Sequence, residues 1–294
     1  MSVAEKAVAR AVRPTRRNGQ FLRRYRRNRA ATLAALVLLA LVIVVIFAGE
    51  LAPYSPLNTD LSAQLQAPSW HHLLGTDEFG RDQLSRVLYG GRASLAVGLG
   101  ATILSVAVGL LVGLQAGFGG RFWDTLLMRV TDGIMAFPAF FLVVAVTAIT
   151  GPSLVNVTLI IGITAWPVVA RLVRAEVLTL KQRDFVTSAR LSGVRSARIM
   201  RTHLIPNILP SLIVAATLQI AFAILTEATL SFLGLGVNPP TPSWGNMLTD
   251  SENYLFTSPW VLVGPGVAIV ITVLCLNFVG DGLRESLDPR LRTR

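Results

Sequence analysis

The sequence contains few charged residues for its length. Only 15% of its 294 residues are charged, whereas 52% are hydrophobic. Soluble domains carry about 25% charged residues, so this composition is typical of an integral membrane protein. The one cysteine, Cys275, excludes a disulfide framework and a cysteine-based metal cluster.

Lysine is also scarce, and its positions exclude a nucleotide-binding loop. A P-loop needs a lysine that follows glycine and precedes serine or threonine, and neither Lys6 nor Lys181 does so. The three histidines, His71, His72 and His203, have no carboxylate or cysteine at metal-ligand spacing. No G-x-S-x-G elbow is present. We therefore expect no catalytic residues, no cofactor and no metal site.

Long uncharged runs predict six membrane-spanning helices, since about 20 apolar residues cross the hydrocarbon core. Gly151 and Pro152 separate the third run from the fourth. The expected spans are residues 30–49, 93–117, 125–149, 154–170, 208–233 and 260–279. The predicted fold class is therefore all-α and integral to the membrane, with one membrane domain over 30–280 and about 90–280 as its core.

The distribution of basic residues predicts the orientation. Ten of the 27 Lys and Arg precede Ala30, and eight more lie between Arg171 and Arg201. No Lys or Arg occurs in residues 234–259. By the positive-inside rule the basic arm (1–29) and the C-terminal tail (281–294) are cytoplasmic. The net charge of +11 also fits nucleic acid, but no reading helix follows the arm, so membrane lipid is the expected partner.

One cytoplasmic loop carries a distinctive pattern, DFVTSARLSG followed by HLIPN. Asp184 is a suitable N-cap and Gly193 a suitable C-terminal stop for a short helix between them. Val186, Ala189, Arg190 and Gly193 share one face of that helix. Small residues on this face would let another protein approach closely, although the positive-inside rule alone also explains the arginines.

The same loop resembles the cytoplasmic motif of ABC importer permeases, in which Glu-Ala-Ala is followed by Gly and then Ile-x-Leu-Pro. Thr187, Ser188 and Ala189 stand at the Glu-Ala-Ala places and Gly193 at the Gly, so the motif's Glu is replaced by Thr187. Further stretches resemble the second permease of dipeptide, oligopeptide and nickel importers: HHLLGTDEFGRDQLSRVLYGGRASLAVG, MRVTDGIMAFP, EATLSFLGLGVNPPTPSWGNML and NFVGDGLRESLDPRLR.

This resemblance implies a type I importer permease with a cytoplasmic coupling helix. The implied partners are a homologous second permease, two cytoplasmic ATPases and an external substrate-binding protein, with ATP hydrolysis on the ATPases. The resemblance implies that the residues that dock the ATPase are Asp184, Phe185, Val186, Ala189, Arg190 and Gly193. Peptides are the expected substrate, and nickel complexes or other small solutes are the alternative.

Three ionisable residues lie within the expected spans, and such residues are candidates for function. Glu227 could carry protons in a secondary transporter, but Thr226, Thr229 and Ser231 are nearby hydroxyl partners that favour a structural role. Arg129 and Asp132 are three residues apart on one helical face and could pair locally, and anchoring at the inner end of the third span is favoured over substrate contact. A membrane anchor without transport activity is a third alternative, and it would not require the pattern at 184–203.

Overall fold

The computed structural model describes residue 23 and residues 25–287. Within this range the chain is helical, and its only β-type pairing is an isolated bridge between Thr76 and Asp82. The helices that precede residue 152 are α3 (Arg29–Ile46), α4 (Ala48–Leu51), η1 (Leu61–Ala63), α5 (Gln83–Phe118), α6 (Arg121–Met135) and α7 (Ala139–Thr150). Those that follow it are α8 (Leu154–Leu180), α9 (Asp184–Leu191), α10 (Ser196–Ile199), η2 (Met200–Leu204), α11 (Ile205–Phe232), α12 (Trp244–Ser251), η3 (Glu252–Tyr254) and α13 (Trp260–Leu287).

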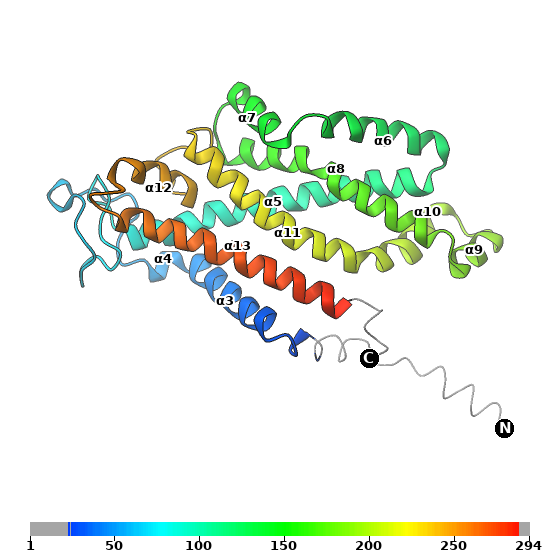
Figure 1. The fold of residues 1–294 in the computed structure, drawn as a ribbon, viewed down its shortest axis with the longest axis horizontal. Coiled ribbons are helices and arrows are strands. Elements are labelled where there is room, and N and C mark those ends of the chain that lie inside the picture. Colours follow the sequence, from blue (N-terminus) through cyan, green and yellow to red (C-terminus); the bar gives the residue numbers. More distant parts are fainter. Residues whose placement is uncertain (1–22, 24, 288–294) are drawn as a thin grey trace.

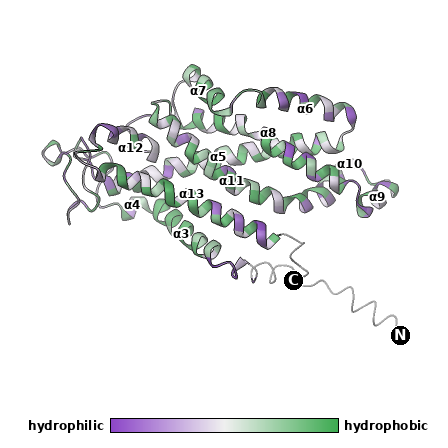
Figure 2. Ribbon diagram, viewed as in Figure 1, coloured by the Kyte–Doolittle hydropathy of each residue, from purple (hydrophilic) through white to green (hydrophobic). Residues whose placement is uncertain are grey.

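Among the described residues, five helical segments are long and apolar enough to cross a membrane, and a bent pair of helices brings the number to six if it counts as one span. The long helices run roughly along one axis, with α9 at one end of the molecule and α12 at the other (Figure 1). Hydrophobic residues cover most of their length, whereas polar residues gather at α9 and in the loops at the opposite end (Figure 2). The expected all-α membrane architecture is therefore confirmed.

The third expected span is broken in the structure. Helices α6 and α7 meet at an angle of 80° across residues 136–138. Pro138 has no N–H, and it disfavours helical backbone at Phe137 before it, so the helix ends at this point. Hydropathy alone did not predict the break, because the residues on both sides are apolar.

The sixth helix is longer than expected. Helix α13 continues to Leu287, past the predicted boundary at Gly280. Near its end the Glu285 carboxylate accepts a hydrogen bond of 2.8 Å from the Asn28 side chain, and the carbonyl of the same Asn28 side chain caps the start of α3. The first and last spans thus lie side by side. Most of the predicted basic arm and the end of the tail fall outside the described residues.

A row of glycines near the end of α5 packs against α8. Gly109, Gly113 and Gly117 lie against the side chains of valines in α8, and a Cβ added at each would come within 2.6 Å of a valine atom or a backbone oxygen. Side chains at these positions would force the two helices apart. This close contact is therefore internal to the chain.

Candidate functional site

The short helix α9 is where the sequence predicted it. It covers Asp184–Leu191, and Gly193 beyond it has φ +72°, a left-handed conformation that glycine adopts without strain. The predicted N-cap is wrong by one residue: Arg183 occupies the cap position without a side-chain hydrogen bond, and Asp184 lies in the first turn. The Asp184 carboxylate there is still favourably placed against the helix dipole.

Val186, one of the residues predicted to dock the ATPase, packs against its own chain. This side chain is completely buried within the chain, in a cluster with Val177, Ile199, Leu204 and Ile208. Ala189 is partly buried against the same cluster. The face that the sequence suggested for a partner therefore contains the residue that anchors α9 to its own chain, because Val186 has no exposed surface left to offer.

The remaining surface of α9 is open. Phe185 is 41% exposed and Leu191 is 85% exposed, and Asp184, Thr187 and Ser188 are also exposed. Phe185 and Leu191 are thus the two large apolar side chains that α9 leaves exposed.

Contacts with the ends of the long helices hold α9 in place. The Arg190 guanidinium lies 4.4 Å from the centre of the Phe118 ring, at the end of α5. The Phe185 ring lies 6.1 Å from that of His203. The helical segment Ser196–Phe232 passes through the π-helical turn η2 and runs on into the bundle as one long span. These contacts connect α9 to the end of α5 and, through η2, to α11.

Asp132 pairs with a different residue from the one predicted. Its carboxylate accepts a hydrogen bond of 2.6 Å from Arg171 of α8 rather than from Arg129. One turn further along α8, the Arg174 guanidinium forms a bidentate pair of hydrogen bonds with the Asp124 carboxylate of α6. These two ion pairs fasten α6 to α8, and Arg129 has no ion-pair partner among the described residues.

Glu227 is fully buried and joins three helices. Its carboxylate accepts hydrogen bonds from Ser231 in the same helix, at 2.7 Å, and from Ser94 of α5, at 3.0 Å. The Ser94 hydroxyl in turn accepts from the backbone N–H of Trp244, the first residue of α12. This network supports the structural role, because a buried carboxylate with such partners fixes the helices around it.

Only one of the three hydroxyls predicted near Glu227 contacts it. The contact with Ser231 is confirmed. The hydroxyls of Thr226 and Thr229 donate to carbonyls one turn back in their own helix. Ser94 could not be found from local spacing, because it lies 133 residues away in the sequence.

A buried ion cluster at the opposite end was not predicted. The Asp77 carboxylate accepts from Arg81 and Arg86 side chains, both at 2.6 Å, and Arg86 also reaches Asp250 near the end of α12 at 3.1 Å. Burial raises the pKa of the Asp250 carboxyl, and the charge on Arg81 opposes this rise. The cluster holds the loop before α5 against α12. The spacing of Asp77 and Arg81 was the only local signal for it.

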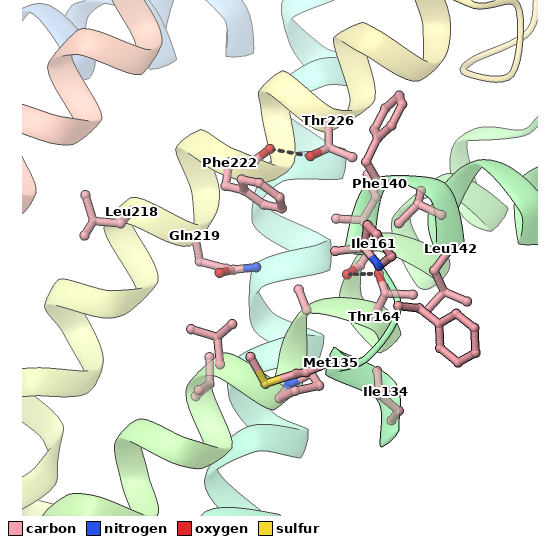
Figure 3. Close-up of a pocket in the computed structure, with 18 of the residues that line it drawn as sticks. Ile134, Met135, Phe140, Leu142, Ile161, Thr164, Leu218, Gln219, Phe222 and Thr226 are labelled. Atoms are coloured by element: carbon pink, nitrogen blue, oxygen red, sulfur yellow. Dashed lines mark hydrogen bonds between the residues drawn. The ribbon is translucent and has the colours of Figure 1, made fainter. Parts of the chain in front are cut away.

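A cavity of about 550 Å³ lies beside the break between α6 and α7. Helices α8 and α11 form its other walls, and no ionisable side chain lines it. Gln219 of α11 extends toward its centre (Figure 3). Its volume is in the range of small-ligand sites.

The chain is similar to known proteins over nearly its whole length. Residues 105–293 match the family described as binding-protein-dependent transport system inner membrane component. Residues 18–68 match the N-terminal TM domain of oligopeptide transport permease C.

Two curated relatives cover most of both chains. The di/tripeptide transport system permease protein DppC of Pseudomonas aeruginosa is 43% identical, over 93% of this chain and 92% of its own length. The dipeptide transport system permease protein DppC of Alkalihalophilus pseudofirmus is 40% identical, over 96% and 92%.

Among solved structures, an inward-facing MetNI methionine ABC transporter chain matches with a TM-score of 0.57 and 20% identity. It covers 70% of this chain and 98% of that chain. At this identity the likeness shows the fold alone.

Proposed function

The chain belongs to the family of binding-protein-dependent transport system inner membrane components and is a permease subunit of an ABC importer, and we propose that di- and oligopeptides are its substrates. The observation that carries the substrate assignment is the 43% identity with a di/tripeptide permease over 93% of the chain. The catalytic step, ATP hydrolysis, belongs to other subunits of such importers. Peptides are favoured over nickel because the relatives described above are named for peptides.

The proposed assembly contains a second, homologous permease, two cytoplasmic ATPases and an external binding protein. The basic residues at 171–201 support a cytoplasmic location for the α9 end of the molecule. The start of α3 and the end of α13 both lie toward the α9 end of the long axis (Figure 1). This arrangement supports cytoplasmic N- and C-termini. Residues 30–280 form the proposed transport domain, with 90–280 as its core.

We assign ATPase docking to the exposed side of α9. Asp184, Phe185 and Leu191 supply the outer surface, and Gly193 leaves room for a partner because nothing lies within 4 Å of a Cβ placed there. Ala189 and Arg190 flank this surface, while Val186 holds the helix on its own chain. Thr187, which replaces the Glu of the family motif, is exposed and cannot supply that residue's charge.

The substrate assignment is tested with the complete importer in proteoliposomes. We expect ATP-dependent uptake of dipeptides, and ATP hydrolysis that rises several-fold when the binding protein carries a dipeptide. A binding protein loaded with a nickel complex is the matched control and should leave both rates at their basal values. Uptake of the nickel complex without uptake of dipeptides would refute the assignment.

The docking assignment is tested by Leu191→Asp. Because this side chain is 85% exposed, the substitution should leave the fold intact but place a charge in the contact with the ATPase. We expect the amount of ATPase that co-purifies with the permeases to fall by about tenfold, equivalent to about 1.4 kcal/mol of binding. Phe256→Asp, at a residue 96% exposed near α12, is the control and should retain the ATPase. Equal retention by both variants would contradict the assignment.

A further inference from the structure

The cavity beside the α6–α7 break is lined almost wholly by apolar and aromatic groups. Phe137, Phe140 and Phe222 border it, and Phe137 and Phe222 are 64% and 50% exposed. In Figure 3 Gln219 and Phe222 of α11 point across the space toward Ile161 and Thr164 of α8. Large aromatic side chains that border a space of about 550 Å³ form a surface suited to apolar groups.

The break in the third span supplies irregular backbone to the same cavity. Pro138 and Phe137, which form the break, are both lining residues. Non-helical backbone at membrane depth is tolerated where it is buried in protein or lines a cavity that holds water. The hydrocarbon of the bilayer would leave the free backbone groups at the break without partners. The position of the break therefore argues against a purely lipid-facing depression.

One polar side chain in the cavity has no partner of its own. The hydroxyls of Thr164 and Thr226 already donate to carbonyls of their own helices, at 2.8 Å. The Gln219 amide has no hydrogen bond to any described residue, and it points into the cavity (Figure 3). A primary amide offers both a donor and an acceptor, as a peptide group does.

No charged side chain lines the cavity, and this limits the classes of ligand that fit it. A metal ion would find only the thioether of Met135 and neutral oxygens, which are poor ligands for nickel. The Gln219 amide can donate to a peptide carbonyl oxygen or accept from a peptide N–H, while the side chains of the peptide contact the phenylalanines. Neutral backbone and apolar side chains of a peptide therefore match the cavity.

We propose that this cavity is part of the peptide path, in which Gln219 hydrogen-bonds the peptide backbone and Phe222 contacts apolar side chains of the substrate. The proposal rests on the proposed function as a peptide importer. It makes Gln219 a residue that recognises all peptides and Phe222 a residue that favours large apolar ones. Helix α11 leads from this cavity to the α9 end, so the same helix would join the path to the ATPases.

The test measures uptake of Ala-Ala and Phe-Phe by the complete importer in proteoliposomes. Gln219→Met keeps the length of the side chain and removes the amide, and we expect it to lower uptake of both dipeptides by about tenfold, the value of one hydrogen bond of about 1.4 kcal/mol. Phe222→Ala should lower uptake of Phe-Phe at least fivefold relative to Ala-Ala. Leu225→Ala is the control, because Leu225 is 44% exposed on the same helix and does not line the cavity.

The outcomes separate this proposal from the proposed function. If the unmodified importer takes up neither dipeptide, the peptide assignment fails and the cavity proposal fails with it. If the unmodified importer takes up both, and Gln219→Met and Phe222→Ala behave like Leu225→Ala, only the cavity proposal fails.

A crosslinking measurement identifies the occupant without relying on Gln219→Met or Phe222→Ala. Benzoylphenylalanine in place of Phe222 keeps an aromatic ring at this position, and it should label a radioactive dipeptide during ATP turnover. Labelling of lipid or of the second permease alone, with no labelled peptide, would overturn the proposal.

Discussion

Replacing Gly113 with leucine is expected to remove most of the folded protein. A Cβ at this position would lie 2.6 Å from the Ala170 carbonyl oxygen and 2.6 Å from the Val173 Cβ. The carbonyl belongs to the backbone of α8 and cannot turn away without loss of its helix. Overpacking in a tight core costs about 1–3 kcal/mol and occasionally more, and a leucine adds three carbons beyond the Cβ. The yield of monodisperse protein in detergent and its midpoint of thermal unfolding measure the effect.

Gly266→Leu is the matched control for that variant. Gly266 also lies inside a long helix, α13, but nothing lies within 4 Å of a Cβ placed there. Leucine has a higher helix propensity than glycine, so this variant should be as stable as the unmodified protein. The contact between α5 and α8 would not be as close as the structure shows if Gly113→Leu and Gly266→Leu gave the same yield and midpoint.

Removing the carboxylate of Asp77 is expected to destabilise the end of the molecule near α12. This buried side chain accepts hydrogen bonds from the guanidinium groups of Arg81 and Arg86 and from the backbone N–H groups of Phe79 and Arg81. Breaking a buried ion pair on one side leaves an uncompensated charge and costs about 3–5 kcal/mol. In Asp77→Ala the two cations Arg81 and Arg86 would have only the one carboxylate of Asp250 between them, and Arg86 is 4% exposed. The loop before α5 should become accessible to protease, and the thermal midpoint should fall.

Asp60→Ala provides the control, since it removes the same charge from the same loop. The Asp60 carboxylate is exposed, and hydrogen bonds from Ser62 hold its pKa below the usual value. These contacts are local, and we expect protease resistance close to that of the unmodified protein. A double variant, Asp77→Ala with Arg86→Leu, should recover part of the lost stability, because one of the two cations that share Asp250 is removed as well. Protease resistance of Asp77→Ala equal to that of Asp60→Ala would refute the structural role of the cluster.

The spans could be predicted because each depends on local composition. A run of about 20 apolar residues that lies in the membrane must form a helix, whatever surrounds it, because its backbone N–H and C=O groups find no other partners there. The third span is the exception. The backbone restrictions of Phe137 and Pro138 break its helix, and hydropathy does not detect such restrictions. Its signal was present as a proline within an apolar run, and the rule for the residue before proline would have found the break.

The candidate sites were less predictable, because their partners lie far apart in sequence. The position of α9 was predicted to within one residue from Asp184 and Gly193, but the burial of Val186 depends on Ile199, Leu204 and Ile208. The pairing of Asp132 with Arg171 spans 39 residues, and it replaced the local pair expected with Arg129. Helical spacing shows which residues share a face but not what that face contacts.

The sequence by itself determined the all-α membrane fold, the position of the short helix at 184–193 and the lack of a nucleotide-binding loop. Each follows from residue types within a few turns of one another. Only the tertiary structure decided that the glycines of α5 face the valines of α8, that Glu227 is held by Ser94, and that Gln219 lies in a cavity at the broken span. These features depend on the packing of helices that are distant in sequence. Local composition determines where a helix forms but not which of its faces contacts its neighbours.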